Sequence, residues 1–161
     1  MPADTLTSEI DRFKDAALRC PIPAAVELIG EKWAFLILRG AFNGLHHFEE
    51  FQAGLGIARN ILTDRLKTLV DHDVLARRPY AEHPGRTLYE YRLTEKGLDL
   101  YPVLVSLMQW GNRYGGFDTG PPVELEHKLC GHTTTPKLVC SECGEELRAR
   151  EVVAHEMVAA P

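Results

Sequence analysis

Two short phrases near the C-terminal end have the form of zinc-binding knuckles. In such a knuckle two metal ligands flank two residues and a glycine follows, so that both side chains point at one ion while the backbone turns. The phrases read HKLCG and CSECG, and their four candidate ligands are His127, Cys130, Cys140 and Cys143. One nitrogen and three sulfur ligands suit tetrahedral Zn²⁺. Because no ligand position stays open, the pattern predicts a structural zinc site in a small zinc-ribbon-like module.

Alternatives to this ligand set stay open. His132 stands two residues after Cys130 and competes for the fourth position, although His127 reproduces the knuckle spacing. The cysteines can also remain reduced without a metal, or Cys130 can form a disulfide with Cys140 or Cys143. A ribbon of about 20 residues cannot bury a core of its own, so its folding would depend on the metal.

Upstream of this tail, the hydrophobic pattern predicts two short helices and a β-hairpin. Apolar residues recur at helical spacing between Phe48 and Leu55, a glycine ends this helix, and a second apolar face begins at Leu62. Two short helices joined by a glycine-containing turn are typical of a helix-turn-helix. Residues 88–93 then alternate as a strand does, after a turn at 83–86. The predicted fold class is mainly α with a small β-hairpin wing (α+β): a winged helix-turn-helix.

Further helices are expected to complete the domain. The continuous apolar run 33–38 fits a buried strand or a buried helix, and its length and glycine-bounded ends favour a helix. Thr94 is expected to cap a long helix that Pro102 bends. Its apolar side chains are Leu98, Tyr101, Leu104, Val105, Leu107, Met108 and Trp110. Such a helix is too apolar to lie free on the surface of a monomer, which predicts a dimer.

The predicted recognition helix and hairpin carry side chains that suit double-stranded DNA. The groove-facing candidates are Arg59, Asn60, Thr63 and Lys67, and the hairpin contributes Arg78 and Arg86. In the major groove arginine forms bidentate contacts with guanine, and asparagine forms them with adenine. The hairpin arginines are placed to meet phosphates, which fixes register without reading sequence. The alternative is that Arg59 and Lys67 form only a solvated helix face.

Five motifs lie between residues 20 and 115. They are Cys-Pro at 20–21, IGEKW at 29–33, ILR at 37–39, LTDRLKTLVDHDVLARR at 62–78 and YRLTEKG at 91–97. Together they resemble the HxlR family of bacterial winged-helix regulators, within the MarR-like superfamily. The resemblance implies a homodimeric transcriptional regulator whose long terminal helix and N-terminal helix form the dimer interface. A two-fold dimer would place its recognition helices about 34 Å apart, on a pseudo-palindromic operator.

The chain departs from the family pattern at two places near the recognition helix. Asp73 stands where the family usually has glycine after that helix, and residues 58–61 read ARNI where the family often has Ser-Pro-Arg-Thr. The base preference of the family therefore does not carry over to this chain.

The remaining cysteine, Cys20, lies apart from the cluster and directly before Pro21. A helix N-terminus favours the thiolate, which lowers the pKa of a thiol. The family resemblance implies a sensor thiol, whose oxidation or alkylation would change DNA affinity. The alternative is an inert cysteine that serves as a small apolar residue.

Composition is that of an ordinary soluble protein, with 45% hydrophobic and 25% charged residues. The net charge of −5 opposes binding to nucleic acid, yet residues 57–92 hold seven basic against five acidic side chains. No apolar run is long enough to span a bilayer, and the acidic N-terminus has no apolar signal-peptide core. A cytoplasmic location without membrane contact is the expectation.

Two other function classes, a zinc-dependent enzyme and a protein-binding adaptor, compete with a DNA-binding regulator. A zinc-dependent enzyme is disfavoured because the sequence has no HExxH motif, no nucleophile elbow and no phosphate loop, so no enzyme is predicted. A winged-helix adaptor that binds proteins instead of DNA is compatible with the net charge. A small-molecule or redox effector would fit the regulator. The expected organisation is a helical arm at 1–19, a winged helix-turn-helix domain with its dimerisation helix at 20–116, and a zinc-ribbon-like module at 123–161.

Overall fold

The computed structural model describes residues 20–83, 85–118 and 120–154, and the arm predicted for 1–19 lies outside them. The chain divides into two compact units. One unit is Ala25–Pro136, and the described residues of the other are 20–24 and 137–154. Among the described residues, no helix has both the length and the apolar character needed to cross a membrane.

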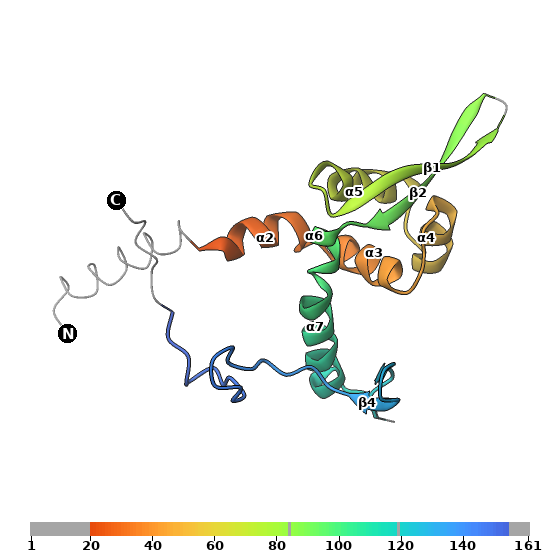
Figure 1. The fold of residues 1–161 in the computed structure, drawn as a ribbon. Coiled ribbons are helices and arrows are strands. Elements are labelled where there is room, and N and C mark those ends of the chain that lie inside the picture. Colours follow the sequence, from red (N-terminus) through yellow and green to blue (C-terminus); the bar gives the residue numbers. More distant parts are fainter. Residues whose placement is uncertain (1–19, 84, 119, 155–161) are drawn as a thin grey trace, which may run out of the picture. The chain divides into compact units, whose positions relative to one another are not determined.

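Within the described residues the chain forms six helices and four strands, and Figure 1 shows their arrangement as a ribbon. In chain order they are α2 (Pro21–Ile29), α3 (Lys32–Phe42), α4 (Phe48–Leu55), α5 (Arg59–Asp71), β1 (Leu75–His83), β2 (Arg86–Leu93), α6 (Glu95–Leu98), α7 (Tyr101–Tyr114), β3 (Leu125–His127) and β4 (His132–Thr134). This order confirms the predicted helix-turn-helix and hairpin. The apolar run 33–38 is helical, as its length and glycine-bounded ends indicated.

The core of the larger unit packs α3, α4, α5 and the start of β1 against one another. Its fully buried side chains are Ile37, Leu38, Phe51, Leu62, Leu66, Leu69, Val74 and Leu75. The three leucines of α5 recur at i, i+4 and i+7, so they share one face of the helix. Each such side chain contributes about 1.5–3 kcal/mol through burial. Burial of this face fixes α5 with its opposite face outward.

The turn between α4 and α5 depends on Gly56. This residue has φ of 61°, the left-handed conformation that glycine adopts without steric cost. Its N–H donates to the carbonyl oxygen of Gln52 at 3.1 Å, which closes α4. Ile57 then enters the core with 3% of its surface exposed, and α5 begins at Arg59. The glycine-containing turn predicted here is confirmed.

The turn after α5 places Asp73 in the left-handed region with φ of 57°. Among the described residues it is the non-glycine residue with positive φ, which explains why the family's pattern has glycine at this point. Short polar side chains tolerate this conformation better than branched ones. The Asp73 carbonyl also accepts a hydrogen bond from Thr94 Oγ1 at 2.6 Å, which ties the turn to the end of the hairpin.

Strands β1 and β2 form an antiparallel hairpin that projects past α4 and α5 (Figure 1). The register runs from Leu75 opposite Leu93 to His83 opposite Arg86, with an irregularity between Pro79 and Ala81. Proline cannot donate to the ladder, which accounts for an irregularity at this point. The predicted wing is therefore present.

The prediction of a single long helix after Thr94 is wrong, because the structure has two helices there, α6 and α7. Thr94 caps α6, its Oγ1 accepting from the N–H of Gly97 at 3.0 Å, but α6 ends at Leu98. Pro102 lies in the first turn of α7. In a helix interior a proline lacks the N–H and its ring clashes with the carbonyl four residues earlier, which kinks or breaks the helix, whereas the first turn of a helix accommodates it. Pro102 therefore starts a new helix, where the sequence pattern suggested only a bend.

Candidate nucleic-acid interface

The four predicted groove-facing residues all lie on the exposed face of α5. They are Arg59, Asn60, Thr63 and Lys67. The helix is held from behind by its buried leucines and by an ion pair between Arg65 and Glu31, whose N–O distance is 2.6 Å. The N-terminal residues of such a helix are the ones that reach base edges when it enters a major groove. The structure thus presents the predicted residues together on one surface.

Arg59 is pre-positioned by an aromatic ring. Its guanidinium lies over the ring of Phe48, 4.7 Å from the centroid, in a cation–π contact between α5 and the start of α4. The carbonyl oxygen of Arg59 accepts a hydrogen bond from Thr63 Oγ1 at 2.8 Å. Moving the guanidinium off the ring would cost about 0.5–1 kcal/mol at this exposed site. Sequence spacing gave no sign of this contact.

Lys67 and Asn60 differ in whether their side chains form hydrogen bonds within the chain. Lys67 Nζ donates to Asp71 Oδ2 at 2.6 Å, and this hydrogen bond raises the pKa of the ammonium, so Lys67 stays charged. Within the described residues, the Asn60 amide makes no hydrogen bond to the chain. Asn60 is therefore free to use its donor and acceptor on a base edge, whereas Lys67 must share its charge with Asp71.

Asp64 belongs to the same exposed face but was not among the predicted contacts. It lies four residues after Asn60 and three before Lys67. A carboxylate repels phosphate and accepts hydrogen bonds only, for example from the amino group of cytosine. Its helical spacing from Asn60 was the sequence signal that could have identified it. The acidic side chains of this surface therefore lower its positive potential around Asn60 and Lys67.

On the wing, Arg78 is exposed on β1 and lies opposite Glu90 in the register. The Glu90 carboxylate bonds instead to Arg92 at 2.8 Å, and this hydrogen bond lowers the pKa of Glu90. Arg86 is the first residue of β2, and its side chain lies outside the described part of the chain. Arg77 was missed by sequence reasoning: its guanidinium lies over the ring of Tyr89, 3.6 Å from the centroid.

The wing and α4 are joined through the residues before α4. The N–H of Tyr91 donates to the carbonyl oxygen of His46 at 2.7 Å, and His47 and Glu90 form an isolated antiparallel bridge. The His47 ring also packs against the Tyr80 ring, with a centroid distance of 4.4 Å. The hairpin is thus attached to the helix-turn-helix by backbone and side-chain contacts as well as by its own strand ends.

Glu50 caps the N-terminus of α4 from its third position. Its Oε2 accepts from the backbone N–H groups of His46 at 2.8 Å and His47 at 2.9 Å, and its Oε1 bonds to His47 Nδ1 at 2.9 Å. The hydrogen bond with the His47 side chain, followed by the two backbone bonds, lowers the pKa of Glu50 to about 2. A depressed carboxyl pKa means that the folded state favours the ionised form.

We expect Glu50→Gln to lower the free energy of unfolding by about 1 kcal/mol at pH 7. The effect is modest because the Glu50 carboxylate is partly exposed and water screens its interactions. The ionised group stabilises the fold above its ordinary pKa of 4.5, and this contribution is lost as the pH falls towards about 2. Urea unfolding at several pH values measures both effects. The matched control is Glu49→Gln on the neighbouring residue. A difference between Glu50→Gln and wild type that is as large at pH 2 as at pH 7 would contradict this account.

The first knuckle phrase forms a tight turn within the larger unit. Strands β3 and β4 pair with His127 opposite His132, and Gly131, with φ of 69°, donates its N–H to the His127 carbonyl at 2.8 Å. His127 Nδ1 lies 3.3 Å from Cys130 Sγ. His132 Nδ1 lies 2.7 Å from the backbone oxygen of Cys130. The turn therefore brings the side chains of His127 and Cys130 together.

The second knuckle phrase forms the same kind of turn in the other unit. Gly144 has φ of 74° and donates its N–H to the Cys140 carbonyl at 2.9 Å. Hydrogen bonds from the backbone of Cys143 and Glu142, and from the Cys143 side chain, hold the pKa of the Cys140 thiol below its usual range. Val139 and Glu146 form a bridge at the base of the turn. Among the residues that the structure describes, no three His, Cys, Asp or Glu side chains are gathered as a metal site would require.

The family profile of the HxlR-like helix-turn-helix matches residues 28–118, which include α3 to α7. The chain belongs to the HxlR-like helix-turn-helix family. A relative in Mycobacterium tuberculosis, the uncharacterized HTH-type transcriptional regulator Rv3095, is 48% identical over 128 residues, which are 80% of each chain. This HxlR-like protein is thus a regulator of transcription, and its family consists of regulators rather than enzymes.

Solved structures also support membership in a family of transcriptional regulators. The crystal structure of PA1607 is 36% identical with a TM-score of 0.76, and the match covers 86% of this chain and 95% of that one. The reduced form of the redox regulator HypR is 28% identical with a TM-score of 0.55 and covers 60% of this chain and 95% of its own. The likeness to PA1607 therefore extends beyond the segment shared with HypR.

Proposed function

We propose that the protein is a homodimeric transcriptional regulator that acts in the cytoplasm and binds a pseudo-palindromic operator in double-stranded DNA. Its α5 would enter the major groove while the wing lies against the backbone. The observation that carries this proposal is the exposed face of α5, where Arg59, Asn60, Thr63 and Lys67 stand opposite a fully buried leucine face. Membership in a family of transcriptional regulators supports it.

The contacts divide into base-reading and phosphate-binding roles. Asn60, which is free of internal bonds among the described residues, is assigned to a base edge, with Arg59 and Thr63 beside it. Arg78 and Arg86 on the wing, and Lys67 once it leaves Asp71, are assigned to phosphates. Phosphate contacts position the protein, whereas base contacts give specificity.

We expect Asn60→Ala to weaken binding to the operator by about 1–3 kcal/mol, with little change on unrelated DNA. Arg78→Gln should weaken binding to both and reduce the salt slope of log K by about one. Fluorescence anisotropy on DNA from the protein's own promoter, measured at several salt concentrations, tests both, with Arg148→Gln as a control. An affinity for promoter DNA that does not depend on salt would favour the adaptor alternative.

Homodimerisation is supported by an apolar stripe on α7, here named the α7 stripe and made of Val103, Leu107, Trp110 and Tyr114. These residues recur at i, i+4, i+7 and i+11, and all are exposed in the single chain, Trp110 by 62%. Ser106, Gln109 and Arg113 lie along one flank of the stripe, whereas the side of the helix opposite the stripe carries Val105, Met108 and Asn112. An aromatic stripe of this kind is more apolar than a monomer surface usually carries, and a second copy would cover it.

We further propose that His127, Cys130, Cys140 and Cys143 bind one structural Zn²⁺ ion. The support is local to each phrase: both turn through a left-handed glycine whose N–H bonds back to the first ligand's carbonyl. In the first phrase the His127 ring nitrogen already lies beside the Cys130 sulfur. Three thiolates and an imidazole are a donor set typical of structural zinc.

Protein purified without a chelator or histidine tag should contain about one zinc per chain. Cys143→Ser and His127→Ala should each reduce this content, whereas Cys20→Ser and His132→Ala should leave it unchanged. Mass spectrometry of the metal, together with the visible spectrum of the Co²⁺-substituted protein, provides the measurement. A zinc content below about 0.3 per chain in the wild type would reject the site. Loss of zinc in His132→Ala would identify His132, in place of His127, as the fourth ligand.

A redox or electrophile response through Cys20 is a third proposal. The redox regulator HypR and the regulator YodB, solved in its reduced form, are similar in fold to this chain. Cys20 is half-buried and stands directly before α2. Oxidant or aldehyde treatment should release wild-type protein from operator DNA but not Cys20→Ser. Equal release of both proteins would show that Cys20 is inert.

A further inference from the structure

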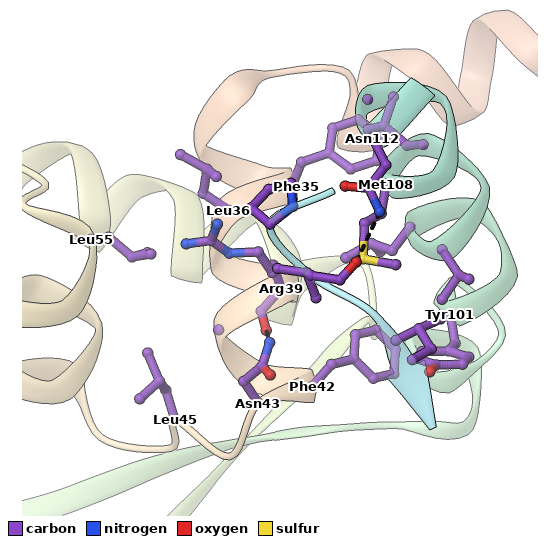
Figure 2. Close-up of a pocket in the computed structure, with 18 of the residues that line it drawn as sticks. Phe35, Leu36, Arg39, Phe42, Asn43, Leu45, Leu55, Tyr101, Met108 and Asn112 are labelled. Atoms are coloured by element: carbon purple, nitrogen blue, oxygen red, sulfur yellow. Dashed lines mark hydrogen bonds between the residues drawn. The ribbon is translucent and has the colours of Figure 1, made fainter. Parts of the chain in front are cut away.

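A cavity of about 740 Å³ lies within the unit Ala25–Pro136, apart from the exposed face of α5 (Figure 2). Its walls come from α3, the end of α4, α7 and the segment 117–125. Most of the lining is apolar, including Phe35, Leu36, Leu45, Leu55, Leu104 and Met108. At one side the rings of Phe42 and Tyr101 meet with a centroid distance of 5.2 Å. Its volume is that of a small-molecule site.

Besides the Tyr101 hydroxyl, three polar side chains line the cavity, and Arg39 is the charged one among them. The amide nitrogen of Asn112 donates to the carbonyl of Val123 at 2.9 Å, and that of Asn43 donates to the carbonyl of Arg39 at 2.7 Å. Arg39 extends from α3 towards Leu55 in Figure 2. In the part of the chain that the structure describes, its guanidinium has no carboxylate partner. A lone guanidinium beside apolar walls favours an anionic group.

We infer that this cavity binds a small apolar molecule that carries one anionic group, such as a carboxylate or a sulfonate. The apolar body would occupy the space between α3 and α7, and the anionic group would pair with Arg39. This occupant accounts for both properties of the cavity, its apolar walls and its single positive charge. It also supplies the regulator with a chemical class of effector.

A second copy of the chain is a less suitable occupant. The cavity is concave and is lined on α7 by Tyr101, Leu104, Val105 and Met108, whereas the α7 stripe lies on another side of the helix. The two sets share Leu107. A second copy can therefore cover the stripe while the cavity remains available to a ligand.

The cavity wall also reaches the helix-turn-helix. Gly54 and Leu55 line it at the end of α4, immediately before the Gly56 turn that leads into α5. An occupant that moves Leu55 relative to α7 would therefore change the placement of α5. This coupling rests on the proposed function, and it must be reciprocal: the ligand lowers DNA affinity by the same factor as DNA lowers ligand affinity.

Gly111 offers a direct way to close the cavity. It lines the wall, and a Cβ atom at this position would meet open space within 4 Å. Gly111→Leu should therefore fill the cavity without backbone strain, and it replaces a poor helix former by a good one. The fold should remain intact, which circular dichroism and the thermal midpoint can verify.

The probe is anilinonaphthalene sulfonate, an apolar fluorophore with one negative charge, compared with uncharged N-phenylnaphthylamine. We expect Gly111→Leu to weaken binding of both dyes by about tenfold or more. Arg39→Gln should weaken binding of the sulfonate by about tenfold and leave the uncharged dye unchanged. Lys32→Gln, which removes a charge from the same helix outside the cavity, is the control.

Unchanged sulfonate binding by Gly111→Leu would overturn the inference, as would equal effects of Arg39→Gln and Lys32→Gln. Dye binding that falls as the protein is concentrated through its dimerisation range would assign the cavity to a second copy instead. A separate titration with operator DNA tests the coupling. If the protein bound no DNA, the dye results would still decide whether the cavity is a ligand site.

Discussion

Trp110→Glu is expected to convert the protein to a monomer and to lower its affinity for a two-half-site operator by at least about 100-fold. Trp110 lies in the α7 stripe with 62% of its surface exposed, and its ring is 5.5 Å from that of Tyr114. A carboxylate buried at this position in a dimer interface would lose its hydration without gaining a partner. In the single chain the same side chain would remain in water, so folding should be unaffected.

The matched control is Gln109→Glu, which adds the same charge one residue earlier on the polar surface of α7. Analytical ultracentrifugation gives the oligomeric state of both variants, and anisotropy gives their affinity for full and half operators. The proposed interface predicts that Trp110→Glu binds the half operator as well as wild type does. If Trp110→Glu sediments as a dimer, α7 does not form the interface.

Gly97→Ala should lower the free energy of unfolding by about 3 kcal/mol, although it adds a single methyl group. Gly97 is buried in α6, and a Cβ at this position would overlap the carbonyl oxygen of Val74 and lie 3.0 Å from Leu93 Cδ2. The Val74 carbonyl also accepts the N–H of Thr94 at 3.2 Å, so it cannot retreat without loss of a hydrogen bond. Backbone, not a flexible side chain, opposes the substitution.

Urea unfolding followed by circular dichroism measures this loss. Gly111→Ala is the control, because a Cβ there meets open space and alanine favours a helix. The control should be neutral or slightly stabilising. A loss below about 1 kcal/mol for Gly97→Ala would mean that α6 can move away from the Val74 carbonyl at little cost.

Much of the winged helix could be predicted because its elements follow from local pattern. The leucines of α5 recur with the helical period, and Gly56 and Gly85 mark turns that require positive φ. The break at Pro102 was predicted only as a bend, because the pattern of apolar residues continues through α6 and α7 even though the backbone does not.

The candidate site could be predicted only as a list of residues. That Arg59 lies on Phe48 and that Lys67 bonds to Asp71 depends on rotamers, which periodicity does not determine. The cavity escaped prediction because its walls come from 35–45, 54–55 and 101–125, segments that only tertiary packing brings together. The zinc ligands remain a prediction from spacing, supported by the turn that each phrase adopts.

The hydrogen bond from the Tyr91 N–H to the His46 carbonyl joins two backbone groups. No substitution of either side chain by another non-proline residue removes it, so drift at these positions leaves the orientation of the wing unchanged. Surface residues of the hairpin such as Arg77 and Arg78 can then be exchanged over generations while their anchorage persists. Under the proposed function, such exchanges on the wing would change the strength of phosphate contacts without a change of architecture and without a change of the bases that α5 reads.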